Sequence, residues 1–243
     1  MKHSIKIILA IVLLSSTVLH AQSYPEMIAV SGGTFTMGNV HGLNEINLQP
    51  PHKVIVNNYS IGKTEVTVAQ YKTYCNATGV KMPKEPSWGR KDNDPIVNVN
   101  WHDASFYCEW LTAVKGEKYS LPTEAQWEFA ARGGNNSRGY FSGGNSILFV
   151  GWFKGNSGSK SHTVASKKPN KLGVYDMSGN VREWCLDLRD ISSYENNSLV
   201  TKKRSVLRGG CRYDKKSKCR IPIRFIIDID YRRNSYGFRV VSF

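Results

Sequence analysis

Apolar side chains recur at helical spacing in the first third of this 243-residue chain. Val68, Tyr71 and Cys75 would share one face of a helix, and the hydroxyl of Thr67 can cap its first turn. We therefore predict a helix over residues 67–75 with a buried face. Cys75 lies on that face and is expected to be a buried thiol rather than a reactive one.

A second helix is predicted over residues 100–111, where His102 or Asp103 precedes an apolar run. One face of this helix consists of Ala104, Tyr107, Cys108 and Leu111. The pattern predicts that this face packs into the core, and that Cys108 is a buried thiol like Cys75.

A third helix is indicated by Thr123 and Gln126, which have the spacing of a capping box, and it continues through 127–132. Short strands are expected at 54–56, 59–62, 205–207, 219–223 and 238–241. Loops rich in glycine and asparagine fill much of the remainder. The pattern predicts an α+β fold in which irregular structure exceeds the roughly 40 per cent that is usual.

The first residues have the order of a secretory signal peptide: two lysines, an uncharged apolar run over 7–14, and small residues up to a cleavage point after Ala21. The apolar run is shorter than the roughly 20 residues that span a bilayer, and no later stretch approaches that length. A buried N-terminal helix is the alternative. We expect a signal peptide at 1–21, one domain at 22–243, no transmembrane segment, and an exported protein of the periplasm, cell envelope or extracellular space.

Basic residues exceed acidic ones, with 33 Lys and Arg against 19 Asp and Glu. A surface of this charge favours polyanions as partners, but the charge does not choose among them. No helix–turn–helix, zinc finger or other docking element for nucleic acid can be recognised, so nucleic acid is not expected as a partner. A solvated surface is the simpler explanation of the charge.

The chain contains five cysteines, which are Cys75, Cys108, Cys185, Cys211 and Cys219. An odd number leaves at least one thiol unpaired within the chain, even where export allows disulfides to form. No C-x-x-C pair occurs, which argues against a zinc ribbon or a thioredoxin-type site.

Six motifs follow one another between Met27 and Val241. They are G-T-F-T-M-G at 33–38, T-E-V-T-V-A-Q-Y at 64–71, P-I-V-N-V-N-W-H-D at 95–103, L-P-T-E-A-Q-W-E at 121–128, N-K-L-G-V-Y-D-M-S-G-N-V-R-E-W at 170–184, and R-G-G at 208–210 with G-F-R at 237–239. In content and order these motifs resemble those of the formylglycine-generating enzyme, or sulfatase-modifying factor, family.

The resemblance implies a compact α+β domain, the formylglycine-generating-enzyme fold, which is a variant of the C-type lectin fold. It also implies that calcium holds the loops in place. Asn180, the carbonyl group of Val181 and the carboxylate of Glu183 would supply the oxygen ligands that calcium prefers. Alternatively, Glu183 pairs with an arginine and Asn180 turns the chain. For a second calcium ion, Gly151 and Asn156 are candidates by position alone.

Four tryptophans fall in or near these motifs, namely Trp101, Trp127, Trp152 and Trp184. The family uses most of these positions in its core, which is expected here. A platform for stacking sugars is the alternative.

The resemblance further implies a catalytic pair of cysteines that binds copper(I), a soft ion suited to thiolates, and oxidises a cysteine of a substrate protein. Counted forward from Gly210, the first of these positions falls on Asp214 and the second on Cys219. Counted back from Gly237, Cys219 instead begins a C-R-x-P-x-R segment and is structural. Cys211 stands where the family usually has serine. Cys219 and Cys211 are therefore the catalytic candidates, in an incomplete pair.

Disulfides are the other possible fate of these cysteines. Cys211 could pair with Cys219, and the resemblance makes Cys185 with Cys219 an equal possibility.

Two functions are consistent with the sequence. The first is an exported oxidase of the formylglycine-generating type that acts on a residue of an exported protein or peptide. The second is a non-catalytic binding module, or a cell-envelope assembly module with an envelope partner, on the same lectin-like fold. The segment 211–219 discriminates between them, because it departs from the catalytic pattern.

Overall fold

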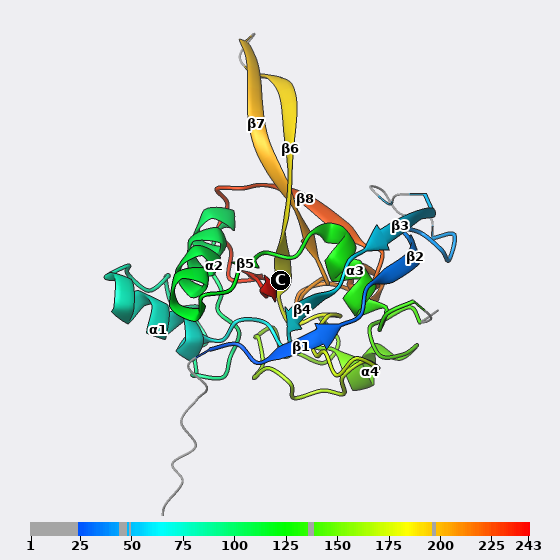
Figure 1. Cartoon of the computed structure of the whole chain (residues 1–243), viewed down its shortest axis with the longest axis horizontal. Helices are drawn as coiled ribbons and strands as arrows, with labels where there is room; N and C mark the ends of the chain where they lie inside the picture. Colours follow the sequence, from blue (N-terminus) through cyan, green and yellow to red (C-terminus); the bar gives the residue numbers. More distant parts are fainter. Residues whose placement is uncertain (1–23, 44–47, 49, 136–138, 196–197) are drawn as a thin grey trace, which may run out of the picture.

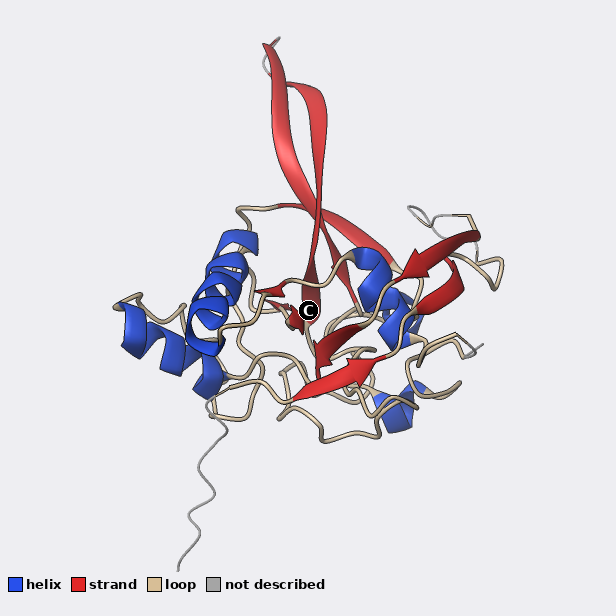
Figure 2. Cartoon of the chain, viewed as in Figure 1, coloured by secondary structure: helices blue, strands red, loops and turns tan. Residues whose placement is uncertain are grey.

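The structure, a computed structural model, describes residues 24–243 apart from 44–47, 49, 136–138 and 196–197, and over 191–195 and 198–200 it describes the backbone alone. The predicted signal peptide lies outside the described residues. Within them, no helix has the length and apolar character that a bilayer-spanning segment needs. Short helices and strands alternate with long loops (Figure 2), and the α+β fold class is confirmed.

Three antiparallel or mixed sheets organise the domain. The first has the order β1-β4-β10-β5, and its strands are β1 (Met27–Val30), β4 (Tyr59–Gly62), β10 (Val241–Ser242) and β5 (Tyr119–Ser120). The second is a hairpin of β2 (Gly33–Met37) and β3 (His52–Val56). The third has the order β8-β7-β6-β9, made of β8 (Arg224–Asp228), β7 (Ser198–Arg208), β6 (Arg182–Glu195) and β9 (Tyr236–Gly237).

Each of the three predicted helices forms and begins with a capping box. Thr67 caps α1 (Val68–Thr78) through Gln70, and Thr123 caps α3 (Glu124–Ala131) through Gln126. α2 (Trp101–Lys115) is capped by Asn100 rather than by His102 or Asp103. The side chain of Asn100 accepts the amide of Asp103, and the side chain of Asp103 accepts the amide of Asn100. Left-handed glycines at Gly79 and Gly116 end α1 and α2, where a side chain would strain the backbone. Two single turns, α4 (Ile147–Val150) and η1 (Lys216–Cys219), lie in the loops.

The hairpin of β6 and β7 projects from the body of the domain (Figure 1). β9 pairs only with Arg182 and Glu183 at the start of β6, and β8 pairs only with residues 204–208 of β7. Beyond these positions the two strands pair only with each other, up to Glu195 and Ser198. The base of the hairpin is thus part of the sheet, whereas its outer half is a two-stranded arm.

Two large apolar clusters make up the core. One joins α1 and α2 to Trp184 and Phe238, and the aromatic rings of Tyr71, Tyr107 and Phe238 stack or meet edge to face within it. The other surrounds Trp127 beneath the β1-β4-β10-β5 sheet. Trp127 and Trp184 are fully buried, as expected, and so are Cys75 and Cys108. Trp101 and Trp152 are only partly buried.

The strands expected at 54–56 and 59–62 are confirmed, and that at 205–207 lies within β7. The strand expected at 219–223 is wrong, because these residues leave η1 and turn before β8 begins at Arg224. Of the strand expected at 238–241, only Val241 is in a strand, β10. Phe238, Arg239 and Val240 cross the core in an extended conformation, and their side chains are fully buried.

Candidate functional site

The two catalytic candidates, Cys211 and Cys219, lie close together, with Cys219 at the end of η1. The Sγ atom of Cys219 is 3.9 Å from the carbonyl oxygen of Cys211, and both side chains are at most 1% exposed. Burial raises the pKa of Cys211 to about 11 and raises the pKa of Cys219 as well. Asp214 raises both pKa values further, and Arg182 opposes the shift. Both residues are therefore neutral thiols at neutral pH.

Asp214, the residue at the first catalytic position in one count, is held by an arginine. Its Oδ1 lies 2.7 Å from Nη2 of Arg182 and its Oδ2 lies 3.1 Å from Nε, a bidentate pair. Oδ2 also accepts a hydrogen bond from the backbone amide of Cys211 at 2.9 Å. Arg182 in turn lies over the ring of Phe225, with its guanidinium carbon 3.7 Å from the ring centre. The carboxylate thus fixes the turn 211–214 to the base of β6.

These residues do not fit a two-thiolate copper site in the geometry described. Copper(I) takes soft thiolate ligands, but the residue that one count places at the first catalytic position is Asp214, whose carboxylate is bound by Arg182, and Cys211 and Cys219 are at most 1% exposed. Each of the five cysteines lies in the described part of the chain and is a free thiol. Neither of the disulfides considered from the sequence is formed.

Two of the three residues predicted to bind calcium, Asn180 and Glu183, have their side-chain oxygens bonded to protein groups. Both carboxylate oxygens of Glu183 face Arg239, at 2.6 Å and 2.8 Å, and Oε2 also accepts the indole N–H of Trp127 at 2.8 Å. The side-chain oxygen of Asn180 accepts the backbone amide of His162 at 2.9 Å. Since no free side-chain oxygen remains, this set does not fit a calcium ion. Glu183 pairs with an arginine, which was the alternative.

Val181 contributes to the same cluster through its amide, which donates to Oε1 of Glu65 at 3.1 Å, while Nδ2 of Asn180 donates to the other oxygen of Glu65 at 2.8 Å. Asn180 has a left-handed backbone with φ of 54°, so it also turns the chain as the alternative expected. Among the described residues, no group of three or more His, Cys, Asp and Glu side chains is arranged to hold a metal ion.

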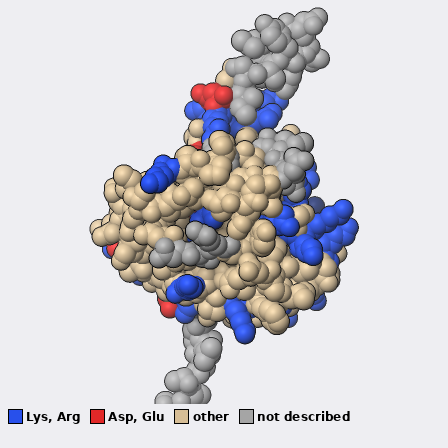
Figure 3. Space-filling model, turned by 90° about the vertical axis from the view of Figure 1, so that its right-hand side faces the viewer, with Lys and Arg blue, Asp and Glu red and all other residues tan. Residues whose placement is uncertain are grey.

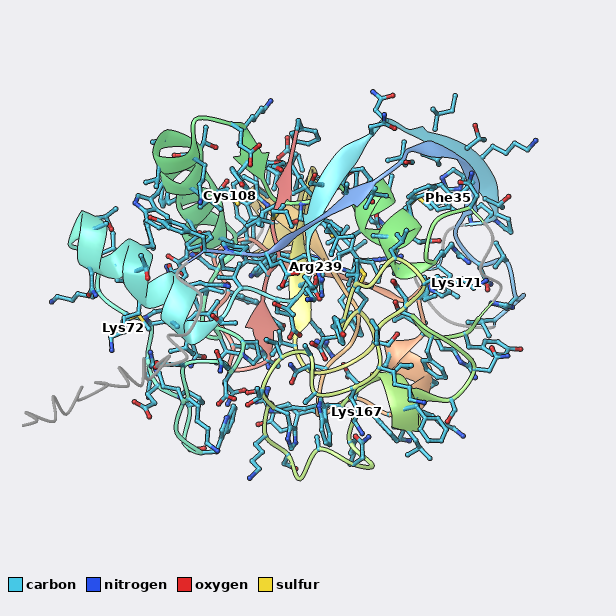
Figure 4. All side chains as sticks on the ribbon, turned by 60° about the horizontal axis from the view of Figure 1, so that its bottom comes forward. Phe35, Lys72, Cys108, Lys167, Lys171 and Arg239 are labelled. Carbon is cyan, nitrogen blue, oxygen red and sulfur yellow. The ribbon has the colours of Figure 1, made fainter. Side chains whose placement is uncertain are left out.

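The buried cluster contains three acidic side chains and one basic side chain. Arg239 lies at the centre of the domain (Figure 4), Glu65, Asp176 and Glu183 lie around it, and all four side chains are at most 2% exposed. Burial and the neighbouring carboxylates raise the pKa of Glu65 well above its usual value. Burial also raises the pKa of Asp176 to about 6. Its Oδ1 atom has no hydrogen-bond partner in the described structure, so its charge is poorly compensated.

An open cleft lies between two loops on the same side of the molecule as the turn 211–214. It has a volume of 380 Å³ and is lined by Trp88, Gly89, Arg90, Lys91, Asp94, Lys160, Ser161, His162 and Thr163. Asp94 is buried and tied to both loops, since it accepts the amide of Lys91 at 3.0 Å and the hydroxyl of Thr163 at 3.1 Å. Lys91 and Lys160 are exposed. The available charge of the cleft is therefore positive.

Arg212 connects the cleft to the C-terminal segment. Its guanidinium carbon lies 4.1 Å from the ring centre of Trp88 and 4.0 Å from that of Tyr213. Asn234 fixes this guanidinium through its backbone and side-chain oxygens, at 2.5 Å and 2.9 Å. The guanidinium of Arg212 therefore holds the Trp88 ring in place at the edge of the cleft. Tyr213, on the same guanidinium, is 45% exposed.

Residues 15–242 match the sulfatase-modifying factor enzyme 1-like domain. The chain belongs to the sulfatase-modifying factor family. It is 28% identical to the formylglycine-generating enzyme of Streptomyces coelicolor, with 88% of each protein covered. It is 32% identical to the serine/threonine-protein kinase pkn1 of Chlamydia pneumoniae over 88% of this chain, but it spans only 37% of that protein's length. The structure of PvdO from Pseudomonas aeruginosa superposes with a TM-score of 0.79 at 27% identity, covering 91% of this chain and 95% of PvdO.

The residues that line the cleft of this sulfatase-modifying factor protein were not singled out from the sequence. Trp88, Lys91 and Lys160 lie outside the six motifs, and their two loops are about 70 residues apart. The signal in the sequence was local, an aromatic residue followed by two basic ones at 88–91. Gly151 and Asn156, the candidates for a second calcium ion, instead bond to each other, with Nδ2 of Asn156 donating to the carbonyl oxygen of Gly151 at 3.0 Å.

Proposed function

We propose that this protein is a ligand-binding member of the sulfatase-modifying factor family and that it does not carry out oxidation with copper. The observation that carries the proposal is the pair of Asp214 and Arg182, because the count forward from Gly210 puts Asp214 where an oxidase of this family would need a thiolate. The protonated, buried state of Cys211 and Cys219 supports it.

The ligand we propose carries a carboxylate, phosphate or sulfate group and binds in the cleft beside Trp88. Exposed Lys91 and Lys160 provide positive charge there, while the one acid of the cleft, Asp94, is already bonded to both loops. Trp88 and His162 add ring faces against which an apolar or planar part of the ligand can pack. An acidic segment of an exported protein or of a cell-envelope partner has this chemistry.

The place of action we propose is outside the cytoplasm. Its support is the sequence of residues 1–21, with two lysines, an apolar run and a cleavage point after Ala21. N-terminal sequencing of the protein isolated from its host tests this, and a mature chain that starts at Gln22 is the expected result.

Copper binding tests the first part of the proposal. The reduced protein is titrated with copper(I) in competition with bicinchoninate, alongside the double variant of Cys211→Ser and Cys219→Ser. We expect both proteins to leave the chelator complex intact. If the native protein takes up one copper(I) ion per chain and the double variant takes up none, the cysteine pair is a copper site. That result would favour the second candidate function, an oxidase.

Ligand binding tests the second part. Trp fluorescence and calorimetry are used to screen acidic peptides and sulfated sugars against the native protein and against Lys160→Gln. The control is Lys72→Gln, since Lys72, labelled in Figure 4, is exposed on α1 and does not line the cleft. Binding that weakens about tenfold in the cleft variant and is unchanged in the control supports the site. Equal binding by both variants contradicts it.

A further inference from the structure

α4 exposes two large apolar side chains to solvent. Ile147 and Val150, three positions apart on this single turn, are 3% and 4% exposed and pack with Phe141 and Cys219. Leu148 and Phe149 lie between them and are 56% and 60% exposed. Because the buried pair fixes the turn, the exposed pair is held outward and cannot fold back onto the domain.

Lysines surround these two side chains. Nζ of Lys167 donates to the carbonyl oxygen of Leu148 at 2.9 Å and lies 4.0 Å from the ring centre of Trp152. Nζ of Lys168 lies 5.6 Å from the ring centre of Phe149, and its backbone amide donates to the carbonyl oxygen of Phe149 at 2.9 Å. Figure 4 shows Lys167 close to α4.

A second turn, η1, packs against the buried side of α4 and carries positive charge. Cys219 of η1 packs against Ile147 and Val150, so η1 lies next to α4, and its Lys216 and the preceding Lys215 are exposed. Asp214, the nearest acid in the sequence, is paired with Arg182.

The sequence around α4 contains no compensating acid. Between Glu128 and Asp176 there is no Asp or Glu, whereas Lys154, Lys160, Lys167, Lys168 and Lys171 all fall in this interval. The face that includes this side of the molecule shows many Lys and Arg side chains and few acidic ones (Figure 3). A patch of exposed apolar side chains within a field of one charge is uncommon on a surface that only contacts water.

We propose that this patch, made of Leu148, Phe149, Lys167, Lys168, Lys215 and Lys216, docks the protein on an anionic phospholipid surface. Leu148 and Phe149 would enter the boundary between headgroups and acyl chains, and the lysines would bind the phosphates around them. Charge complementarity carries the choice of partner, because Lys167 and Lys168 flank the apolar pair and lysine stems keep their ammonium groups at the headgroup level. An acidic protein is the other kind of partner, and the test separates the two.

The test is sedimentation of the full mature protein with vesicles of phosphatidylcholine alone or with about a third of phosphatidylglycerol. We expect binding only to the anionic vesicles, with a decrease of tenfold or more at high salt, because several lysines act together. Phe149→Ser should weaken binding at least tenfold. The matched control is Phe106→Ser, since Phe106 is 53% exposed on α2, outside the patch.

A second variant separates charge from apolar contact. Lys167→Gln with Lys168→Gln should abolish the preference for anionic vesicles, and circular dichroism should show that each variant is folded. No binding to either kind of vesicle overturns the proposal and leaves a protein as the partner of the patch. Equal loss in Phe106→Ser, or full binding by Phe149→Ser, also overturns it. The cleft plays no part in this experiment, so Lys160→Gln, which tests the proposed ligand site, should bind vesicles as Phe106→Ser does.

Discussion

Arg182, at the start of β6, donates hydrogen bonds to both carboxylate oxygens of Asp214, at 2.7 Å and 3.1 Å. The two side chains are 17% and 13% exposed, so the pair is largely removed from water. It connects the sheet at the base of the hairpin to the turn that contains Arg212, the residue packed against Trp88 of the cleft. The ion pair therefore contributes to the stability of this turn.

Asp214→Asn should lower the free energy of unfolding by about 2–3 kcal/mol, because it leaves the charge of Arg182 partly buried without a partner. Urea denaturation measures this. Asp230→Asn is the control, since Asp230 is 77% exposed and only 3.8 Å from a histidine nitrogen of His102. A loss no larger than that of the control would mean that Arg182 finds water or another acceptor.

Arg239→Met should cost about 3–5 kcal/mol or prevent folding, since the buried carboxylates of Glu183, Glu65 and Asp176 would lose the cation among them. Arg233→Met, at an exposed position, should be close to neutral. The comparison is made by thermal and urea unfolding. Similar stability of the two variants would show that the three acids are protonated in the folded protein and need no cation.

Asp176→Asn should stabilise the protein at pH 8 and have little effect at pH 3.5. The pKa of Asp176 is raised from 3.8 to about 6 in the folded state, so between these values the folded state retains a proton that the unfolded chain has released. Stability therefore falls as pH rises through this window, by up to about 3 kcal/mol, and the penalty is complete above pH 6.

Urea midpoints at several pH values, with Asp230→Asn alongside, measure this difference. The native protein should lose stability between pH 4 and 6 relative to the Asp176→Asn variant. If the variant is instead the less stable protein at pH 8, the charge of Asp176 is compensated by a group that the structure does not include.

No thiol of the native protein should react with a thiol-specific dye, and all five should react after denaturation without reductant. All five cysteines are free and at most 5% exposed. Absorbance of the released dye gives the count. Three reactive thiols in the denatured protein would reveal one disulfide and return the pairs Cys211–Cys219 and Cys185–Cys219 to consideration.

Excess calcium and excess chelator should give the same melting temperature. The oxygens of Asn180 and Glu183 that were expected to bind calcium are already bonded to His162, Arg239 and Trp127. Scanning calorimetry on the two samples makes the comparison, with magnesium as the control for ionic strength. A higher melting temperature with calcium, but not with magnesium, would show that the folded protein binds a structural calcium ion.

Local signals in the sequence predicted the elements that depend on neighbouring residues. The cap at Thr67 and the capping box of Thr123 with Gln126 involve residues close together along the chain, so both could be recognised, and both helices begin as expected. The motifs around Trp127 and Trp184 likewise predicted buried residues and the family.

Features that depend on distant residues could not be predicted in the same way. Glu183 is a plausible calcium ligand when the local sequence is considered alone. In the folded domain both of its carboxylate oxygens accept hydrogen bonds from Arg239, which lies 56 residues later in the chain. Apolar and other residues alternate over 219–223 as they would in a strand. However, Cys219 packs in the apolar cluster with Ile147 and Val150 of α4, and the chain turns there. The cleft beside Trp88 likewise requires two loops that meet only in the folded domain.

The placement of β10 sets the order in which the domain can be completed. Val241 and Ser242 pair with β4 on one side and with β5 on the other, so this late segment joins strands from the first half of the chain. Arg239 enters the charged centre from the same segment. A growing chain that still lacks these residues has neither the middle strand of its first sheet nor the counter-ion of its buried acids, so the domain can be completed only after this segment has been synthesised.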